Sequence, residues 1–338
     1  MLRLRRTGDL AMVDAGRTTL AEFGRERWWP LYASTLERNT RATYASLWDK
    51  HVLPRIGGLR LRELRPEVLQ RFRTDLERAG VGPAATRKTL MLLQGVLQRA
   101  VEWGALPTNP MRAVRKPASA REREVRPPAP AAIEGLRAWV LDNAPHREQR
   151  MRHRDATLIS VLAYAGLRPQ EALALTWSHV REHTLLIERA TDFAGNLKST
   201  KTRRARTVTL LAPLAGDLAE WRLASGRPAS AALVFPAGSG QLWQRHDWQN
   251  WRNRTFIPGA RAANLESRVP YDLRHAFCSL LLAEGCTFIE VAGQLGHAPS
   301  MTSDTYGHVI QELAGQRDPA EEQIRRARQA PGAVAGHA

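Results

Sequence analysis

The segment from residue 271 to residue 306 contains the side chains that cleavage of a phosphodiester requires. It reads YDLRHAFCSLLLAEGCTFIEVAGQLGHAPSMTSDTY. In such chemistry an arginine binds the phosphate, a histidine donates or shuttles a proton, and a tyrosine attacks. The residues concerned are Arg274, His275, His297 and Tyr306. Each of these residue types is ordinary by itself, so the surrounding elements must bring them together.

Two helices are expected to carry most of this segment. The apolar spacing predicts a helix over 272–284, whose buried stripe leaves Arg274 and His275 outside it. A second helix over 287–295 would place His297 just beyond its last turn. The arginine and both histidines would then be accessible at helix ends or on exposed faces.

A second cationic group is predicted upstream, in the stretch LRPQEALALTW. Gly166 ends one helix and Pro169 begins the next, so Arg168 lies at a helix N-terminus, where an anion is favoured. Glu171 is one turn further on and could brace the guanidinium. The alternative interpretation is a purely structural Arg168–Glu171 pair.

The pattern changes from helical to alternating between residues 184 and 211. TLLIERA and ARTVTLL are rich in β-branched residues, and the polar connection between them predicts a hairpin. Lys198 and Lys201 lie in the part after the turn. A lysine can give up a proton when its surroundings lower its pKa, which an arginine cannot do. The alternative is a solvated hairpin tip.

The charge balance indicates a polyanionic partner. The 338 residues carry a formal net charge of +17, which favours nucleic acid. Arginine supplies most of the positive charge. GC-rich coding would explain the preference for arginine over lysine, but it does not explain the excess of basic over acidic residues. Cys278 and Cys286 lie among apolar residues and are expected to be reduced core residues of a cytoplasmic protein. No apolar run is long enough to span a bilayer.

The sequence predicts a mainly α fold with a small antiparallel β-sheet, in two domains. Helices fill the first domain, with Pro30 expected to interrupt the first of them. The expected boundaries are a flexible basic tail at 1–17, a helical DNA-binding domain at 18–111, a basic Pro-containing linker at 112–130, a catalytic domain at 131–315 and a C-terminal helix and tail at 316–338. The candidate DNA-binding residues are Arg38, Arg41, Lys50, Arg87, Lys88, Arg99, Arg115, Lys116 and Arg245. Three tryptophans, Trp243, Trp248 and Trp251, are expected in the core.

Taken together, the ordered motifs resemble those of the tyrosine recombinase (phage integrase) family. The matching stretches are AGLRPQEALALTW, STKTRRARTVTL, YDLRHAF and LGHAPSMTSDTYGH. The resemblance covers residues 131 to 315, and the helical region 18–111 is similar to the family's core-binding domain. It implies that Tyr306 attacks the scissile phosphate to form a 3′-phosphotyrosyl link, without ATP or metal.

The resemblance also implies a role for each other site residue. Arg168 and Arg274 would clamp the non-bridging phosphate oxygens, and His297 would hydrogen-bond the phosphate. Lys201 would protonate the leaving 5′-oxygen, with Lys198 as the second choice. The sequence departs from the family at Tyr271, where the proton-accepting histidine usually stands. Tyrosine is a poor base near neutral pH because its ordinary pKa is about 10, so either His275 or water would take the proton.

The implied partner is double-stranded DNA, bound by a homotetramer whose C-terminal tails contact neighbouring protomers, with a possible accessory directionality factor. The implied setting is cytoplasmic and nucleoid-associated, bacterial or phage-encoded, and the sequence leaves open a phage, a conjugative element or a chromosomal system. Two other functions remain open, namely a catalytically impaired DNA-binding protein of the same fold and a type IB topoisomerase-like strand cleaver.

Overall fold

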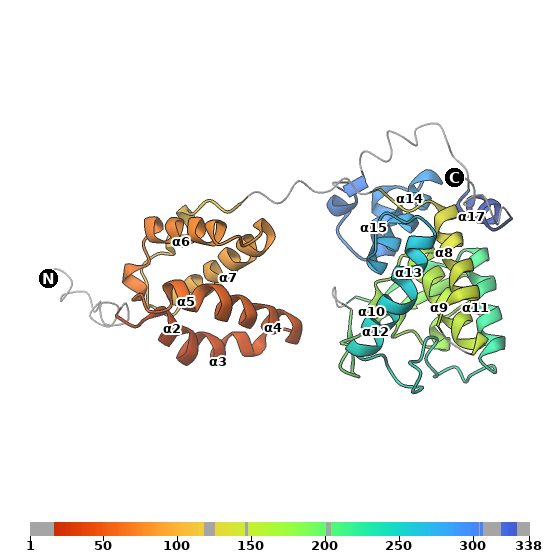
Figure 1. The fold of residues 1–338 in the computed structure, drawn as a ribbon, viewed down its shortest axis with the longest axis horizontal. Coiled ribbons are helices and arrows are strands. Elements are labelled where there is room, and N and C mark those ends of the chain that lie inside the picture. Colours follow the sequence, from red (N-terminus) through yellow and green to blue (C-terminus); the bar gives the residue numbers. More distant parts are fainter. Residues whose placement is uncertain are drawn as a thin grey trace, which may run out of the picture. The chain divides into compact units, whose positions relative to one another are not determined.

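The computed structural model describes residues 17–117, 126–145, 148–200, 204–303, 305–306 and 319–329. The chain forms two compact units, Met1–Arg123 and Glu124–Ala338 (Figure 1). Each unit has its own buried hydrophobic core. Among the helices in these ranges, none combines the length and the apolarity that a bilayer crossing demands.

The first unit is entirely helical in its described part, apart from one isolated bridge (Figure 1). Its α-helices are α2 (Leu20–Phe23), α3 (Trp29–Leu31), α4 (Arg38–Leu47), α5 (Leu53–Ile56), α6 (Pro66–Arg78) and α7 (Pro83–Glu102). Its other turns are π-helical η2 (Gly24–Trp28) and η4 (Trp48–Val52) and 3₁₀-helical η3 (Ala33–Thr35), η5 (Leu61–Glu63) and η6 (Pro110–Ala113). Thr19 begins α2 with a capping box to Glu22, because its hydroxyl and the Glu22 carboxylate each accept from the other residue's backbone N–H.

Proline does not interrupt the helices in the expected way. Helix α3 continues directly from η2 through Pro30, so the predicted break at this residue is wrong. The residue before the proline, Trp29, donates its N–H to Gly24 O, five residues back. The same π-type bond precedes Pro54 and Pro258. A widened turn therefore lets the helix pass a residue that has no N–H to donate.

The second unit is built around α9 (Gln149–Tyr164). Every residue of α9 from Arg154 to Tyr164 is buried, because its apolar residues surround the helix instead of forming one stripe. Helices α8, α11 and α14 pack against it. The α-helices are α8 (Pro130–Asn143), α10 (Pro169–Ala172), α11 (Ala212–Ala224), α12 (Arg245–Trp251), α13 (Ile257–Ala262), α14 (Arg274–Ala283), α15 (Phe288–Leu295) and α17 (Ala320–Gln329). The shorter turns are η7 (Trp177–His179), η8 (Arg252–Phe256) and η9 (Pro270–Leu273).

The predicted hairpin is present as two antiparallel pairs. Strands β1 (Thr184–Ile187) and β4 (Arg206–Thr209) pair with Thr184 opposite Thr209, and β2 (Arg189–Thr191) pairs with β3 (Leu197–Ser199). The mainly helical fold with a small antiparallel sheet is confirmed. The expected core tryptophans Trp243 and Trp251 are buried, and Trp248 is half-buried against them.

The C-terminal helix α17 packs on its own unit, against α8, α11 and α14. The sequence predicted a neighbouring protomer as its support, because the helix has little apolar surface. Within the single chain Ala320 and Ile324 are fully buried, and Arg328 reaches Asp217 at 2.7 Å. Charged contacts thus supply what the short apolar stripe lacks.

Candidate active site at the end of helix α15

Three arginines converge on the C-terminal turn of α15. Arg206 donates to Gln294 O at 2.7 Å, Arg274 donates to Leu295 O, and Arg168 donates to Gly296 O at 3.1 Å. The last carbonyls of a helix have no intrahelical partner and carry partial negative charge. One helix end therefore holds three guanidinium groups close together.

Glycine at residue 296 makes this arrangement possible. Gly296 ends α15 with a φ of 67°, a conformation that side chains disfavour. A Cβ at this position would also lie 2.9 Å from the Arg206 side chain. His297 follows directly after this turn, as predicted.

Arg274 occupies a different environment from the one predicted. Its side chain is not off the buried stripe, because α14 is covered on nearly all sides and only 3% of the residue is exposed. The guanidinium donates to Gly166 O as well as to Leu295 O. Burial, and then the charge of Arg168, lower the pKa of Arg274 to about 10. The group stays protonated at neutral pH and is held by backbone oxygens.

Glu171 joins two of the arginines. Its carboxylate accepts from the Arg168 guanidinium at 2.8 Å, as predicted, and from Arg206 at 2.7 and 3.1 Å. Burial alone would raise the pKa of this carboxyl, but hydrogen bonds and charge from Arg206 and then Arg168 lower it below its ordinary value. Glu171 is therefore a buried anion that fixes two cations.

Arg206 was missed by the sequence reasoning. It begins β4, and a signal was available, because Arg206 and the buried Val208 lie two residues apart and share one face of the strand. An arginine on the inward face of a strand needs a buried partner. The abundance of arginine in this chain hid that signal.

The candidate nucleophile Tyr306 is buried, with 4% of its surface exposed. Its hydroxyl is hydrogen-bonded to Nδ1 of His275. Burial, followed by the nearby Cys278 thiol, raises the pKa of Tyr306 above the ordinary tyrosine value. The hydroxyl is thus protonated in this state and needs a base before it can attack. Tyr271 lies on the surface, with 41% exposed.

His297 is half-buried and lies beside the arginine cluster. Its Nδ1 is 3.2 Å from Ala298 O and 3.4 Å from the Thr302 hydroxyl. Burial, and next the charges of Arg274, Arg168 and Arg206, lower the pKa of His297. At neutral pH the ring is uncharged and suited to hydrogen bonding. Lys201 lies outside the described residues, whereas Lys198 is half-buried on β3.

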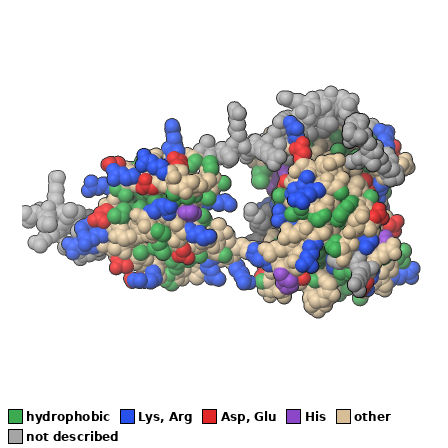
Figure 2. Space-filling view, in the orientation of Figure 1, with side chains coloured by type: hydrophobic (Ala, Val, Ile, Leu, Met, Phe, Trp, Pro, Cys, Tyr) green, Lys and Arg blue, Asp and Glu red, His purple; other side chains and the backbone are tan. Residues whose placement is uncertain are grey.

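Lysine and arginine side chains are spread over the visible face of each unit (Figure 2). By exposure, the candidate DNA-binding residues fall into two groups. The exposed ones are Arg38, Arg41, Lys50, Lys88, Arg115 and Arg245. The half-buried ones have contacts within the protein: Arg87 donates to Pro117 O, Lys116 donates to the Gln94 side chain, and Arg99 lies 4.2 Å over the Tyr32 ring. A cavity of about 320 Å³ between α4 and α7 has Lys88 on its wall.

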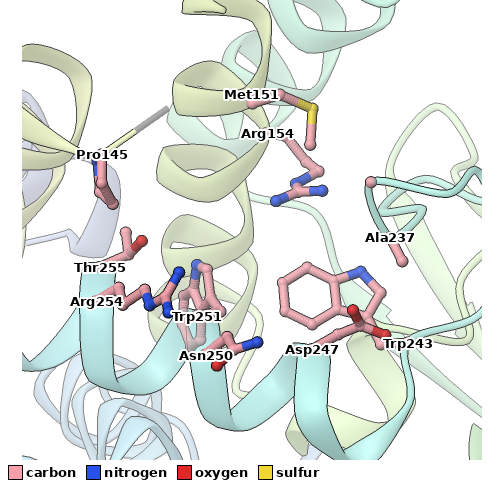
Figure 3. Close-up of a pocket in the computed structure, with 11 residues that line it drawn as sticks. Pro145, Met151, Arg154, Ala237, Trp243, Asp247, Asn250, Trp251, Arg254 and Thr255 are labelled. Carbon is pink, nitrogen blue, oxygen red and sulfur yellow. The ribbon is translucent and has the colours of Figure 1, made fainter. Parts of the chain in front are cut away.

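A separate cavity of about 270 Å³ lies among the tryptophans of the second unit (Figure 3). Trp243 and Trp251 line it, and the buried Arg154 guanidinium lies 4.9 Å over the Trp243 ring. Arg154 is also bound to Asp155 and Pro236 O. None of the candidate site residues lines this cavity, so it is separate from the arginine cluster.

Sequence comparison matches both units to known families. Residues 140–312 match the phage integrase family, and residues 19–76 match the phage integrase N-terminal SAM-like domain. An integrase of Streptomyces ambofaciens is 27% identical over 297 residues, covering 82% of this chain and 73% of that protein. The tyrosine recombinase XerD of Yersinia pestis is 27% identical over 302 residues, covering 83% of this chain and 90% of that protein.

Solved structures show the same fold. The Tn1549 transposon integrase in complex with a circular intermediate DNA superposes with a TM-score of 0.70 at 15% identity, covering 85% of this chain and 95% of that one. A lambda integrase tetramer bound to a Holliday junction gives 0.64 at 14% identity, covering 88% of this chain and 81% of that one. The family match spans more than half of the sequence, and the chain belongs to the phage integrase family of tyrosine-type site-specific DNA recombinases.

Proposed function

We propose that this recombinase cleaves and rejoins DNA through a 3′-phosphotyrosyl intermediate on Tyr306, with neither metal nor ATP. The observation that carries the proposal is the convergence of Arg168, Arg274 and His297 at the end of α15. A covalent intermediate divides one difficult transfer into two easier ones and conserves the phosphodiester bond energy for rejoining.

The cationic cluster would stabilise the pentacoordinate transition state. Arg168 and Arg274 bind its non-bridging oxygens, and the neutral His297 donates a hydrogen bond. Because backbone carbonyls and Glu171 already fix the two guanidinium groups, little reorganisation is needed when charge develops. Lys201 protonates the leaving 5′-oxygen, with Lys198 as the alternative.

Both units would contact the DNA duplex. The exposed basic residues of region 18–111, together with the net charge of +17, favour phosphate contacts. Region 131–315 would form the catalytic domain, with 112–130 as a linker. The working assembly would be a tetramer on two duplexes, like the lambda integrase tetramer on a Holliday junction, in a cytoplasmic, nucleoid-associated setting and with a directionality factor.

The test needs the attachment site, which a repeat in the DNA flanking the gene would identify. A nicked duplex carrying that repeat is incubated with the protein, and covalent adducts are separated by denaturing electrophoresis. We expect an adduct that Tyr306→Phe abolishes without weakening DNA binding. Site-specific binding without an adduct would instead indicate the catalytically impaired binding protein.

A sulfur-substituted substrate assigns the leaving-group acid. A 5′-bridging phosphorothiolate leaves without protonation, so it should restore cleavage to Lys201→Ala. If it restores Lys198→Ala instead, the acid is Lys198. Relaxation of supercoiled DNA that lacks the repeat would favour the topoisomerase-like alternative.

A further inference from the structure

In the second unit, the candidate nucleophile, a histidine and a carboxylate from three segments lie in a row in space. The Tyr306 hydroxyl is hydrogen-bonded to Nδ1 of His275, in the first turn of α14. On the other side of the ring, Nε2 lies 3.9 Å from Oδ1 of Asp272 in η9. A nucleophile held by a base, which is itself faced by an acid, is the arrangement that activates hydroxyl nucleophiles.

The carboxylate is fixed in its position. Asp272 accepts a hydrogen bond from the Ser267 hydroxyl, and its backbone N–H donates to Val269 O at 2.9 Å. The separation of 3.9 Å from His275 is too long for a direct hydrogen bond but close enough for attraction between charges. Negative charge beside Nε2 favours the tautomer with its proton there, which leaves the Nδ1 lone pair for Tyr306.

We propose that His275 accepts the Tyr306 proton during strand cleavage and that Asp272 positions and stabilises the resulting imidazolium. This inference rests on the proposed function and concerns the same site. It assigns to His275 the role that a histidine at position 271 would otherwise have, and it leaves Tyr271 outside the proton transfer.

The step balances in protons and bonds. The Tyr306 O–H bond breaks and its proton moves to Nδ1, while the tyrosine oxygen bonds to phosphorus. The phosphorus–O5′ bond breaks, and the leaving oxygen takes a proton from the lysine acid. Rejoining reverses both transfers, because the 5′-hydroxyl attacks and His275 returns its proton to Tyr306.

The groups that face His275 make it a neutral base near pH 7. Burial, and then the charge of Arg274, lower the pKa of His275, and Asp272 opposes them. In the described part of the chain, Tyr306 itself, Cys278 and Tyr271 are also ionisable groups at this site. Burial raises the pKa of Cys278 to about 12, so that it stays an uncharged thiol. The ring is therefore unprotonated at neutral pH and becomes protonated below pH 6.5, the ordinary histidine value.

The pH profile of single-turnover adduct formation tests this assignment. Wild type should form adduct at a constant rate near neutral pH and lose activity below pH 6.5. His275→Asn keeps a hydrogen-bonding partner for Tyr306 but takes no proton, so adduct formation should fall about 10²-fold or more and the acid limb should vanish. The matched control is His183→Asn, since the His183 side chain is 84% exposed; its profile should equal that of wild type.

Two further measurements separate proton transfer from a structural role. Free imidazole should restore adduct formation to His275→Ala, whereas a 5′-bridging phosphorothiolate should not, because it replaces only the acid. Asp272→Asn should move the acid limb to lower pH and slow the plateau less than His275→Asn does. DNA binding and the melting temperature show whether each variant is folded.

Different outcomes contradict the proposed function and the assignment of His275 as the base. If wild type forms no adduct on its site, the proposed function fails. If wild type reacts and His275→Asn retains the wild-type rate and acid limb, then His275 is not the base. The same conclusion follows if the 5′-bridging phosphorothiolate restores adduct formation to His275→Ala.

Discussion

Arg168 and Arg206 donate to the same carboxylate, although one follows helix α9 and the other begins strand β4. Arg206 donates hydrogen bonds to both carboxylate oxygens of Glu171. Arg168 donates from its guanidinium to one of these oxygens and from its backbone N–H to the other. The carboxylate thus ties the strand that follows the Lys201 region to the proposed phosphate clamp.

Replacing Arg206 should destabilise the second unit. In Arg206→Gln, Glu171 remains buried with one charged partner fewer, at a cost of about 3 kcal/mol in the free energy of unfolding. Denaturant unfolding measures this cost. Arg204→Gln, at an exposed residue close by, is the control and should change the stability little. Equal stability of the two variants would contradict a structural role for Arg206.

The pH dependence of stability should reveal Glu171. Its folded-state pKa is lowered, so its contribution is present above the unfolded value of about 4.3 and is lost as pH falls through the lower folded value. The wild-type melting temperature should therefore drop more steeply in acid than that of Glu171→Gln. Parallel melting curves against pH would show that Glu171 is not responsible.

Gly296→Ala should impair cleavage more than DNA binding. A residue with a side chain is strained at a φ of 67°, and the new Cβ would clash with the Arg206 side chain. Both effects displace the turn that holds Arg168. We expect adduct formation to fall at least 10-fold, because the clamp loses its geometry. Gly285→Ala has the same kind of strain, at a φ of 97°, but open space around it. If both variants lose activity equally, backbone strain alone explains the effect.

Tyr271→His should leave the acid limb of cleavage in place. The side chain at this position is largely on the surface, and His275 already contacts the nucleophile. The measurement is the rate of adduct formation between pH 5 and 8, roughly the range in which histidines titrate. A second limb that appears only in Tyr271→His would show that position 271 takes part in the proton transfer.

Arg328→Ala should release helix α17. Arg328 donates to Asp217 at 2.7 Å and to Pro213 O at 3.0 Å, and loss of these charged hydrogen bonds costs about 2 kcal/mol. Protease cleavage within 319–329 should accelerate. Arg325→Ala is the control, because Arg325 pairs with Glu322 on the same helix. If assembly on DNA is unchanged in a chain that lacks 317–338, the tail has no role between protomers.

The sequence was informative where a residue's role depends on local geometry. Gly296 predicts His297 directly beyond a helix end, and Gly166 together with Pro169 predicts Arg168 at a helix start, because helix ends are decided within one turn. Burial depends instead on elements distant in the chain. Arg274 was expected on an open face because its own helix suggests one, yet α9 and α15 cover that face.

Ion pairs between residues far apart in the chain could not be predicted from local sequence patterns either. Glu171 was assigned to Arg168 three residues away, whereas its second partner Arg206 is 35 residues further along the chain. The docking of α17 follows the same rule, since its ion pair with Asp217 joins residues that are 111 positions apart. In a chain with this many arginines, the partner of a given carboxylate is decided by the fold.

The end of helix α15 has a consequence for how the enzyme is switched. Its three consecutive carbonyls hold Arg206, Arg274 and Arg168, so a rotation or unwinding of that single turn alters all three contacts together. Any partner or DNA distortion that moves α15 would break or restore the contacts of all three arginines together. Under the proposed function, competence for cleavage in each copy of the chain would then be all-or-none.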